Sequence, residues 1–200
     1  MRDRVSMSNK SSKLEIKKIV LIALMTAMIC VISPFAVAIP ISPVPISLAT
    51  FAIYLVVILL GCKDGTLSVL IYVVLGFAGA PVFTGFTGGV AKVLGPTGGY
   101  IIGYVFLALI EGLFVKKARE SRQHKTTIGA SIMIFAGMLL GTVVLYIFGT
   151  FWLAKQSGMT LLAAFFVAVV PFVIGDIVKM IIALFIGKKI RSVLINNNLL

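Results

Sequence analysis

Two oppositely charged residues, Asp176 and Lys179, stand three positions apart in the sequence GDIVK, inside a long apolar stretch. At helical spacing their side chains share one face. A charged residue near the bilayer centre costs about 2.5–3.5 kcal/mol on insertion scales, so two such groups in an apolar stretch indicate a role. The pair offers a carboxylate acceptor and an ammonium donor, which suit a small ligand with amide-like N–H groups and an anionic oxygen. The alternative is an ion pair that satisfies itself and only fixes the helix to its neighbours.

Glu111 is another acidic residue within an apolar stretch. It precedes Lys116 and Lys117 by little more than a helical turn. We expect an interfacial ion pair or a snorkelling side chain at this position, without a role in binding.

A second candidate binding element is PVFTGFTGGVAKVLGPTGGY, residues 81–100, which is rich in glycine. Non-helical backbone at membrane depth occurs where it is buried in protein or lines a cavity. Glycine lets the backbone adopt unusual dihedral angles and approach a ligand closely. Gly95, Gly99 and Gly103 also recur every four residues, which predicts close helix packing as an alternative or additional role.

The segment FAVAIPISPVPIS, residues 35–47, contains Pro40, Pro43 and Pro45 and carries no charge. Its prolines favour an extended backbone. It is either an apolar lid over a site or a stiff connector, and the sequence leaves both interpretations open.

Membrane-spanning helices are predicted to position these residues. Of 200 residues, 60% are hydrophobic and the mean hydropathy is +1.15, far outside the usage of soluble globular proteins. A helix needs about 20 apolar residues to cross a bilayer. Runs such as IYLVVILL do not alternate in polarity, which argues against a β-barrel. We predict an all-α polytopic membrane protein, one domain over residues 1–200 with six spans, at 16–33, 46–60, 66–80, 98–115, 128–152 and 160–186.

The distribution of Lys and Arg predicts the orientation, because these residues accumulate in cytoplasmic loops. They cluster in the N-terminal segment 1–15, between the fourth and fifth spans and in the tail 188–200, whereas Lys92 and Lys155 fall on the other side. Both termini are therefore predicted to be cytoplasmic. This topology in a lipid bilayer explains the net charge of +12, so no nucleic-acid partner is expected. The basic start followed by AVA at 36–38 imitates a signal peptide, but further spans would retain the protein, and we predict a first span there.

No residues with the arrangement of a catalytic or metal site are found. His124, the sole histidine, lies in a basic loop, and no Ser/His/Asp or Cys/His arrangement can form within the membrane. Cys30 and Cys62 are predicted at opposite sides of the bilayer, so neither a disulfide nor a thiol metal site is expected. The chain also lacks G-x-x-x-x-G-K-[ST]. We predict a protein that is not an enzyme, has no cofactor, and needs a partner for any process driven by ATP.

The combination of GFAGAPVFTGFTGG, GPTGGY and the later GDIVK resembles the BioY family, the biotin-binding S components of energy-coupling factor (ECF) vitamin transporters. The resemblance covers essentially the whole chain. It implies six spans with cytoplasmic termini in the bacterial cytoplasmic membrane, and capture of biotin at the outer side. It also implies partners, namely a membrane coupling protein and two cytoplasmic ATPases, within which the S component topples and releases its vitamin inward.

The positions that this resemblance assigns to substrate binding lie in the sixth span and the 81–100 loop: Asp176, Lys179, Tyr100, Thr97, Gly98, Gly99, Phe83 and Thr84. Phe83 and Thr84 occupy the neighbourhood where family members can carry an asparagine, and Thr84 lacks the amide for a bidentate contact. Biotin offers two ureido N–H donors, a ureido oxygen, an apolar thioether ring and a valerate carboxylate. Asp176 would accept from the ureido N–H groups, while Lys179 would meet either the carboxylate or the ureido oxygen.

Ala23 and Ala27, in ALMTA, match the small-xxx-small pattern by which S components contact the coupling protein. Small residues let membrane helices approach closely where no hydrophobic effect drives association. The resemblance therefore places the partner surface on the first helix.

Other functions remain compatible with the same residues. The chain could be a self-sufficient carrier or channel that uses Asp176 as a proton or ion site, or a structural membrane subunit whose polar pair serves packing. An S component for a different vitamin is a further alternative.

Overall fold

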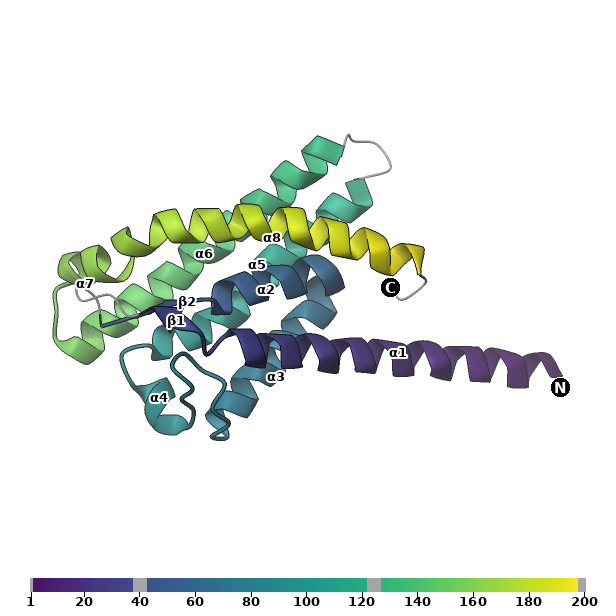
Figure 1. Ribbon diagram of the computed structural model, residues 1–200, viewed down its shortest axis with the longest axis horizontal. Helices are drawn as coiled ribbons and strands as arrows, with labels where there is room; N and C mark the ends of the chain where they lie inside the picture. The colour runs from purple at the N-terminus through teal and green to yellow at the C-terminus, as the bar shows by residue number, and fades with distance from the viewer. Residues whose placement is uncertain (1, 38–42, 122–126, 198–200) are drawn as a thin grey trace.

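The structure is a computed structural model that describes residues 2–37, 43–121 and 127–197, with side chains from Glu15 onward apart from Thr127. Six longer helices form the body of the molecule (Figure 1): α1 (Arg2–Ile32), α2 (Ala49–Leu60), α3 (Cys62–Phe77), α5 (Gly98–Glu120), α6 (Thr127–Ser157) and α8 (Val170–Asn196). Two short helices, α4 (Val90–Leu94) and α7 (Leu161–Ala168), and a hairpin of β1 (Ala36–Val37) and β2 (Ile46–Ser47) lie at the end opposite the two termini.

The helical class of the fold is confirmed, and the protein is a multi-pass membrane protein. Among the described residues, three helices are long and apolar enough to cross a bilayer: Gly98–Glu120, Ile128–Ser157 and Val170–Asn196. Ala49–Leu60 is a shorter apolar helix. The number of six spans and the orientation of the termini stay predictions.

The predicted single span over residues 160–186 was wrong, because α7 and α8 are separate helices. Val169 leaves the helical conformation with φ −124° and ψ −55°. Pro171 follows in the first turn of α8, where its missing N–H is tolerated, but its ring would clash inside a continuous helix. Helix α8 then continues to Asn196, so it also carries the cations assigned to a tail beginning at residue 188.

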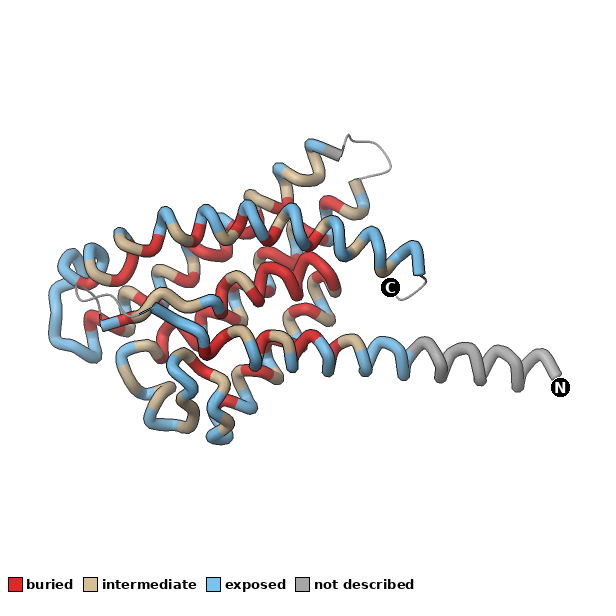
Figure 2. Tube along the Cα trace, in the orientation of Figure 1, coloured by how far each residue is buried: buried red, intermediate tan, exposed pale blue. Residues whose placement is uncertain are grey.

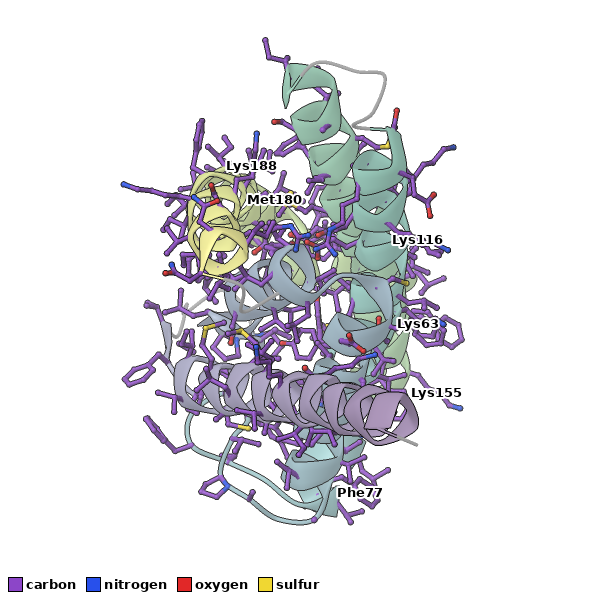
Figure 3. The ribbon with its side chains drawn as sticks, turned by 90° about the vertical axis from the view of Figure 1, so that its right-hand side faces the viewer. Lys63, Phe77, Lys116, Lys155, Met180 and Lys188 are labelled. Atoms are coloured by element: carbon purple, nitrogen blue, oxygen red, sulfur yellow. The ribbon has the colours of Figure 1, made fainter. Side chains whose placement is uncertain are left out.

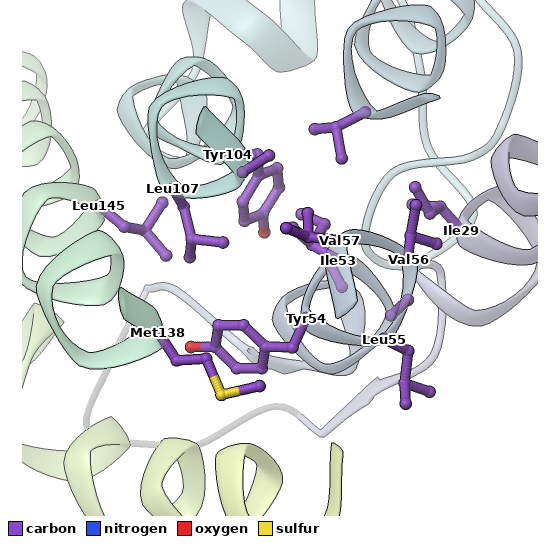
Figure 4. Close-up of a cluster of buried hydrophobic side chains, with 14 of the residues drawn as sticks. Ile29, Ile53, Tyr54, Leu55, Val56, Val57, Tyr104, Leu107, Met138 and Leu145 are labelled. Atoms are coloured by element: carbon purple, nitrogen blue, oxygen red, sulfur yellow. The ribbon is translucent and has the colours of Figure 1, made fainter. Parts of the chain in front are cut away.

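Helix α2 forms the centre of the core. It contacts α1, α3, α5 and α8, and nearly all of its residues are buried (Figure 2). In Figure 4, Ile53, Tyr54 and Val57 of α2 face a cluster that includes Leu107 of α5 and Met138 of α6. Because protein surrounds α2 on several sides, a helix too short to span lipid by itself is stable here.

The predicted close packing after the 81–100 loop is confirmed where α5 meets α6. A side chain at Gly99 would clash with the main-chain oxygen of Phe148 and with Trp152. A Cβ at Gly103 would lie 2.7 Å from Leu145 Cδ1. These two glycines let the helices approach as small residues do in membrane bundles.

The expected surface ion pair of Glu111 was wrong. Its side chain is fully buried, and neither carboxylate oxygen has a hydrogen-bond partner among the residues that the structure describes. Lys116 instead pairs with Glu120 at 3.8 Å, and Lys117 is exposed. The helical register turns Glu111 toward α6, where a side chain at Gly137 would contact the backbone of Glu111.

Candidate binding site beside the Asp176–Lys179 pair

Asp176 and Lys179 form an ion pair on α8. Lys179 Nζ lies 2.8 Å from Asp176 Oδ1, and only 7% of the Asp176 side chain and 12% of the Lys179 side chain are exposed. The ammonium also donates to the main-chain oxygen of Ser47 at 2.7 Å, which attaches β2 to α8. The predicted common face of the pair is therefore confirmed.

The Asp176 carboxylate also has partners on two other helices. Thr50 of α2 donates to Oδ1 at 3.3 Å, and Tyr146 of α6 donates to Oδ2 at 2.5 Å. Lys179 Nζ lies 3.4 Å from Thr50 Oγ1. Hydrogen bonds to ionised groups are among the stronger ones, so these contacts hold the charged pair in a defined position between α2, α6 and α8.

A cavity of about 40 Å³ lies beside the pair and has tyrosines in its wall. Four of the five tyrosines of the chain line it: Tyr72, Tyr100, Tyr104 and Tyr146. Small-molecule sites usually measure about 300–1,000 Å³. The walls must therefore move apart before a vitamin-sized ligand can bind.

The 81–100 loop contributes Phe83, Thr84 and Thr97 to this wall. Phe83 is buried and packs edge to face on Tyr72, with a ring centroid distance of 5.6 Å. Its ring occupies the space that a side chain at Gly76 would fill. The Thr97 hydroxyl is buried and has no partner among the described residues, so it is available to a ligand.

Tyr100 lines the cavity with its ring, while its hydroxyl already has a protein partner. The hydroxyl donates to the main-chain oxygen of Ala168 at 2.6 Å, at the end of α7. Tyr100 thus connects the start of α5 to the end of α7, and its contact with a ligand stays a prediction.

Gly98 and Gly99 lie behind the cavity wall, and neither is among the residues that line it. Both are buried against α6, where a Cβ at Gly98 would lie 2.9 Å from Trp152 Nε1. The same indole nitrogen donates to the main-chain oxygen of Gly95 at 2.9 Å. In this geometry the two glycines serve packing, which is one of the roles predicted for the loop.

Lys92 of α4 also lines the cavity, which the motifs in the sequence did not predict. Its side chain is half-buried, and it forms no ion pair with any residue in the described part of the chain. Burial lowers the pKa of Lys92 below its ordinary value. The site therefore has a second cation besides Lys179, and the available signal was a single lysine within an otherwise uncharged glycine-rich loop.

Described residues of the 35–47 segment line the cavity, namely Val44, Pro45 and Ser47, and Val44 is buried. The amide of Gly85 donates to the main-chain oxygen of Pro34 at 2.9 Å, so the residue just before this segment is attached to the 81–100 loop. Whether the segment is a lid or a connector stays a prediction. Residues 38–42, including Pro40, lie outside the described residues.

A larger hollow of about 540 Å³ lies on the other side of Asp176, between α6, α7 and α8. Its wall is almost entirely apolar, with residues such as Val143, Phe165 and Val173. Polar recognition requires donors and acceptors, so the small cavity is the candidate binding site in spite of its volume.

Comparison with known protein families shows to which family this chain is related, because the BioY family model matches residues 7–196. The chain belongs to the BioY family.

BioY relatives match over nearly the whole chain. The "Probable biotin transporter BioY" of Pyrococcus horikoshii is 39% identical over 176 residues, which are 88% of this chain and 97% of the relative. "Biotin transporter BioY2" of Lactococcus lactis is 34% identical, over 89% of this chain and 92% of the relative. The crystal structure of "the S-component for biotin from an ECF-type ABC transporter" superimposes with a TM-score of 0.79 at 34% identity, over 90% of this chain and 93% of that one.

The prediction that the chain is not an enzyme is confirmed by its place in the BioY family, whose members compared above are named as transporters or a transporter component. His124 lies outside the described residues. Cys30 and Cys62 are present as free thiols.

Sequence reasoning missed Tyr146 and Thr50 as partners of the central pair in this BioY chain. Tyrosine in membrane proteins usually collects at the lipid–water interfaces, so a tyrosine deep in an apolar span was a usable signal. Thr50 had no comparable signal, because a threonine near the start of an apolar helix is common. Only the packing of α2 beside α8 brings it to Asp176.

Ala23 and Ala27 lie on the exposed face of α1. Ile19 and Leu24 on the same side are also exposed, whereas Ile22 and Met25 pack inward. The two alanines are therefore accessible to a partner helix, and their role in this BioY chain stays a prediction.

We expect Tyr146→Phe to weaken ligand binding about tenfold while the protein stays folded. The change removes one hydrogen bond to a buried carboxylate, for which about 1.5–3 kcal/mol is typical, and leaves the aromatic ring in place. Titration of the purified variant measures the effect. Tyr54→Phe is the matched control, because Tyr54 bonds Thr142 at 2.5 Å and does not line the cavity. If Tyr146→Phe and Tyr54→Phe lose the same amount of ligand affinity, the Tyr146 hydroxyl contributes to packing of the helices and not specifically to the binding site.

Proposed function

We propose that this chain is the substrate-binding subunit for uptake of biotin, capturing it in the cavity between the 81–100 loop and α8. The observation that carries the proposal is the Asp176–Lys179 pair, held beside a small cavity lined by tyrosines. The names of the relatives support biotin as the ligand.

The ureido group of biotin matches the central pair. It presents N–H donors next to a carbonyl oxygen, and the pair presents a carboxylate next to an ammonium at 2.8 Å. Asp176 accepts from the ureido N–H groups, and Lys179 donates to the ureido oxygen. The aromatic rings of Tyr72 and Phe83 then surround the apolar thioether ring.

Lys92 takes the valerate carboxylate in this arrangement. It lines the same cavity from α4, whereas Lys179 is engaged with Asp176 and Ser47. A cation without a described carboxylate partner has its charge available to an anion. This assigns the two lysines to opposite ends of the vitamin, with Thr97 and Thr84 as further polar contacts from the loop.

Biotin enters by displacement of the 35–47 segment, acting as a lid, and of the 81–100 loop. The cavity of about 40 Å³ is too small for the vitamin, and most of the described residues in these two segments are non-helical. Closure over the bound ligand would exclude water and strengthen its polar contacts.

The chain lies in the bacterial cytoplasmic membrane with six spans in this proposal, contributed by α1, α2, α3, α5, α6 and α8. Both termini lie at one end of the bundle, and α4 and β2 lie toward the other (Figure 1). Lys92 of α4 and Ser47 of β2 line the cavity, so the cavity lies toward that other end. Clustering of Lys and Arg at the terminal end favours the cytoplasm for that end, and the cavity then opens outward.

Energy comes from an ATP-driven ECF module of a membrane coupling protein and two cytoplasmic ATPases. The related crystal structure of an S component from an ECF-type transporter supports this partnership. The exposed alanines of α1 provide the surface for the coupling protein.

The test is titration of the full chain, purified in detergent after growth without added vitamin, with biotin, thiamin and riboflavin. We expect saturable binding of biotin and none of the other two. Binding of another vitamin in place of biotin would contradict biotin as the substrate, but it would remain consistent with a vitamin-binding subunit of the same architecture. No binding by well-folded protein would favour a structural subunit. Gradient-driven uptake by vesicles that contain only this chain would favour a self-sufficient carrier.

We expect Lys92→Gln to weaken binding of biotin about tenfold and to leave binding of neutral biotinamide unchanged. The reason is that a charge-assisted contact, typically about twice as strong as a neutral one, exists only with the carboxylate. Titrating the wild type and Lys92→Gln with biotin and with biotinamide gives four affinities. These form a double-mutant-type cycle that isolates the contact between Lys92 and the carboxylate. If biotinamide and biotin lose affinity equally in the variant, Lys92 does not bind the carboxylate.

The affinity of the wild-type chain for biotin is expected to fall at alkaline pH. Burial lowers the pKa of Lys92, so the ammonium loses its proton at a lower pH than an ordinary lysine, and the attraction to the carboxylate is lost as pH rises through that value. Binding curves across the alkaline range measure this, with Lys92→Gln as the comparison. An identical fall in the variant would assign the pH dependence to another group.

A further inference from the structure

A second charged cavity lies at the end of the bundle that carries both termini, where α2, α5, α6 and α8 meet (the end viewed in Figure 3). Its volume is about 230 Å³. Arg119 of α5 and Lys188 and Arg191 of α8 line it. None of the described residues that line it is acidic.

The two arginines are held close together by one main-chain acceptor. Arg119 Nη2 donates to the oxygen of Leu59 at 3.2 Å and to that of Ile58 at 2.8 Å. Arg191 Nη1 donates to the same Leu59 oxygen at 2.9 Å. Two like charges that share an acceptor repel each other, and an anion between them relieves this repulsion.

Capping of α2 explains part of this arrangement. Ile58 and Leu59 belong to the last turn of α2, whose carbonyl groups have no partner within the helix and are attractive to cations. Gly61 leaves room for the guanidinium, because a Cβ there would lie 2.6 Å from Arg119 Nη1. The carbonyl end of a helix corresponds to about half a negative charge, however, which does not balance Arg119 and Lys188, and neither of these forms an ion pair with a described residue.

The rest of the lining shows what kind of anion fits. Ile58, Val115, Ile134 and Ile195 form an apolar wall next to the cations. On the outer surface of the neighbouring helices, Ile132 and Phe185 are strongly exposed, as expected for contact with lipid. A ligand with a phosphate on an apolar body therefore matches this cavity better than a free inorganic ion does.

We propose that this cavity binds the phosphate of an anionic phospholipid, with the lipid glycerol and upper acyl chain along the apolar wall. Basic pockets between membrane helices near a bilayer surface are suited to such headgroups. The arginines offer planar, paired donors to the phosphate oxygens, and Lys188 supplies a further charge. This inference is independent of the ligand assigned to the Asp176 cavity.

The test is native mass spectrometry of the full chain, purified and freed of lipid, with phosphatidylglycerol or phosphatidylcholine added. We expect preferential retention of phosphatidylglycerol. Lys188→Gln should weaken this retention about fivefold and Lys188→Gln/Arg191→Gln by more, since one basic residue near an anionic surface contributes about that factor. Lys189→Gln is the matched control, because Lys189 neighbours Lys188 but does not line the cavity.

Each outcome decides the proposal. Equal retention by the wild type, Lys188→Gln and Lys189→Gln would overturn it, and so would equal retention of the two lipids. Displacement of phosphatidylglycerol by dilute inorganic phosphate would overturn the lipid as the source of the anion. The single Lys188→Gln variant leaves both arginine contacts with α2 in place, so the test does not depend on folding of the double variant.

Discussion

Lys179→Met is expected to reduce biotin affinity at least about a hundredfold, which corresponds to about 2.8 kcal/mol. The substitution removes the cation assigned to the ureido oxygen. Among the described residues, it also leaves the Asp176 carboxylate with only the hydroxyls of Thr50 and Tyr146 as partners. Breaking a buried pair from one side typically costs about 3–5 kcal/mol of stability, so the melting temperature should fall as well. Biotin titration and a thermal melt of the same preparation measure both effects.

The double variant Asp176→Asn/Lys179→Met separates binding from folding. Removing both charges leaves no uncompensated ion, and stability should return toward that of the wild type. Binding should stay lost, because neither the carboxylate nor the ammonium is restored. A stable double variant that binds biotin as the wild type does would show that the pair serves packing only.

Ala27→Trp is expected to abolish biotin uptake in cells that contain the complete transporter, while the isolated chain binds biotin normally. Ala27 is exposed on α1 and does not line the cavity, so binding is not affected directly. An indole at this position prevents the close approach of a partner helix, which small residues permit. Uptake of labelled biotin and titration of the purified variant are the two measurements.

Ala163→Trp on α7 is the matched control for this experiment. Ala163 is also exposed, but α7 packs on α6 and α8, away from the face that α1 presents. The control should retain uptake. If Ala27→Trp lost both biotin binding and uptake, the result would contradict the assignment of α1 as the coupling surface. Normal uptake by Ala27→Trp would contradict it as well.

The two experiments address separate parts of transport. The Asp176 cavity lies toward the end of the bundle with α4, α7 and the β-hairpin, whereas the alanines lie on the outer surface of α1. In the proposed function, capture therefore depends on contacts inside the chain, and coupling depends on a surface that is complete without the ligand.

The sequence by itself determined the helical membrane class, the common face of Asp176 and Lys179 in GDIVK, and the family. These follow from local properties, since hydropathy needs no partner, and a helix places Asp176 and Lys179 on one face wherever it packs. The motifs of the 81–100 loop were also recognisable, although they did not show that Gly98 and Gly99 pack against Trp152.

Tertiary structure alone decided which groups complete the site and where the last apolar stretch divides into the two helices α7 and α8. Thr50, Tyr146 and Lys92 reach the cavity from three separate elements, and their contacts depend on how α2, α6 and α4 pack. The burial of Glu111 and the approach of Arg119 to Arg191 depend on packing in the same way. Hydropathy cannot distinguish an apolar helix face that meets lipid from one that meets protein, so only the packed helices show which polar groups lie together.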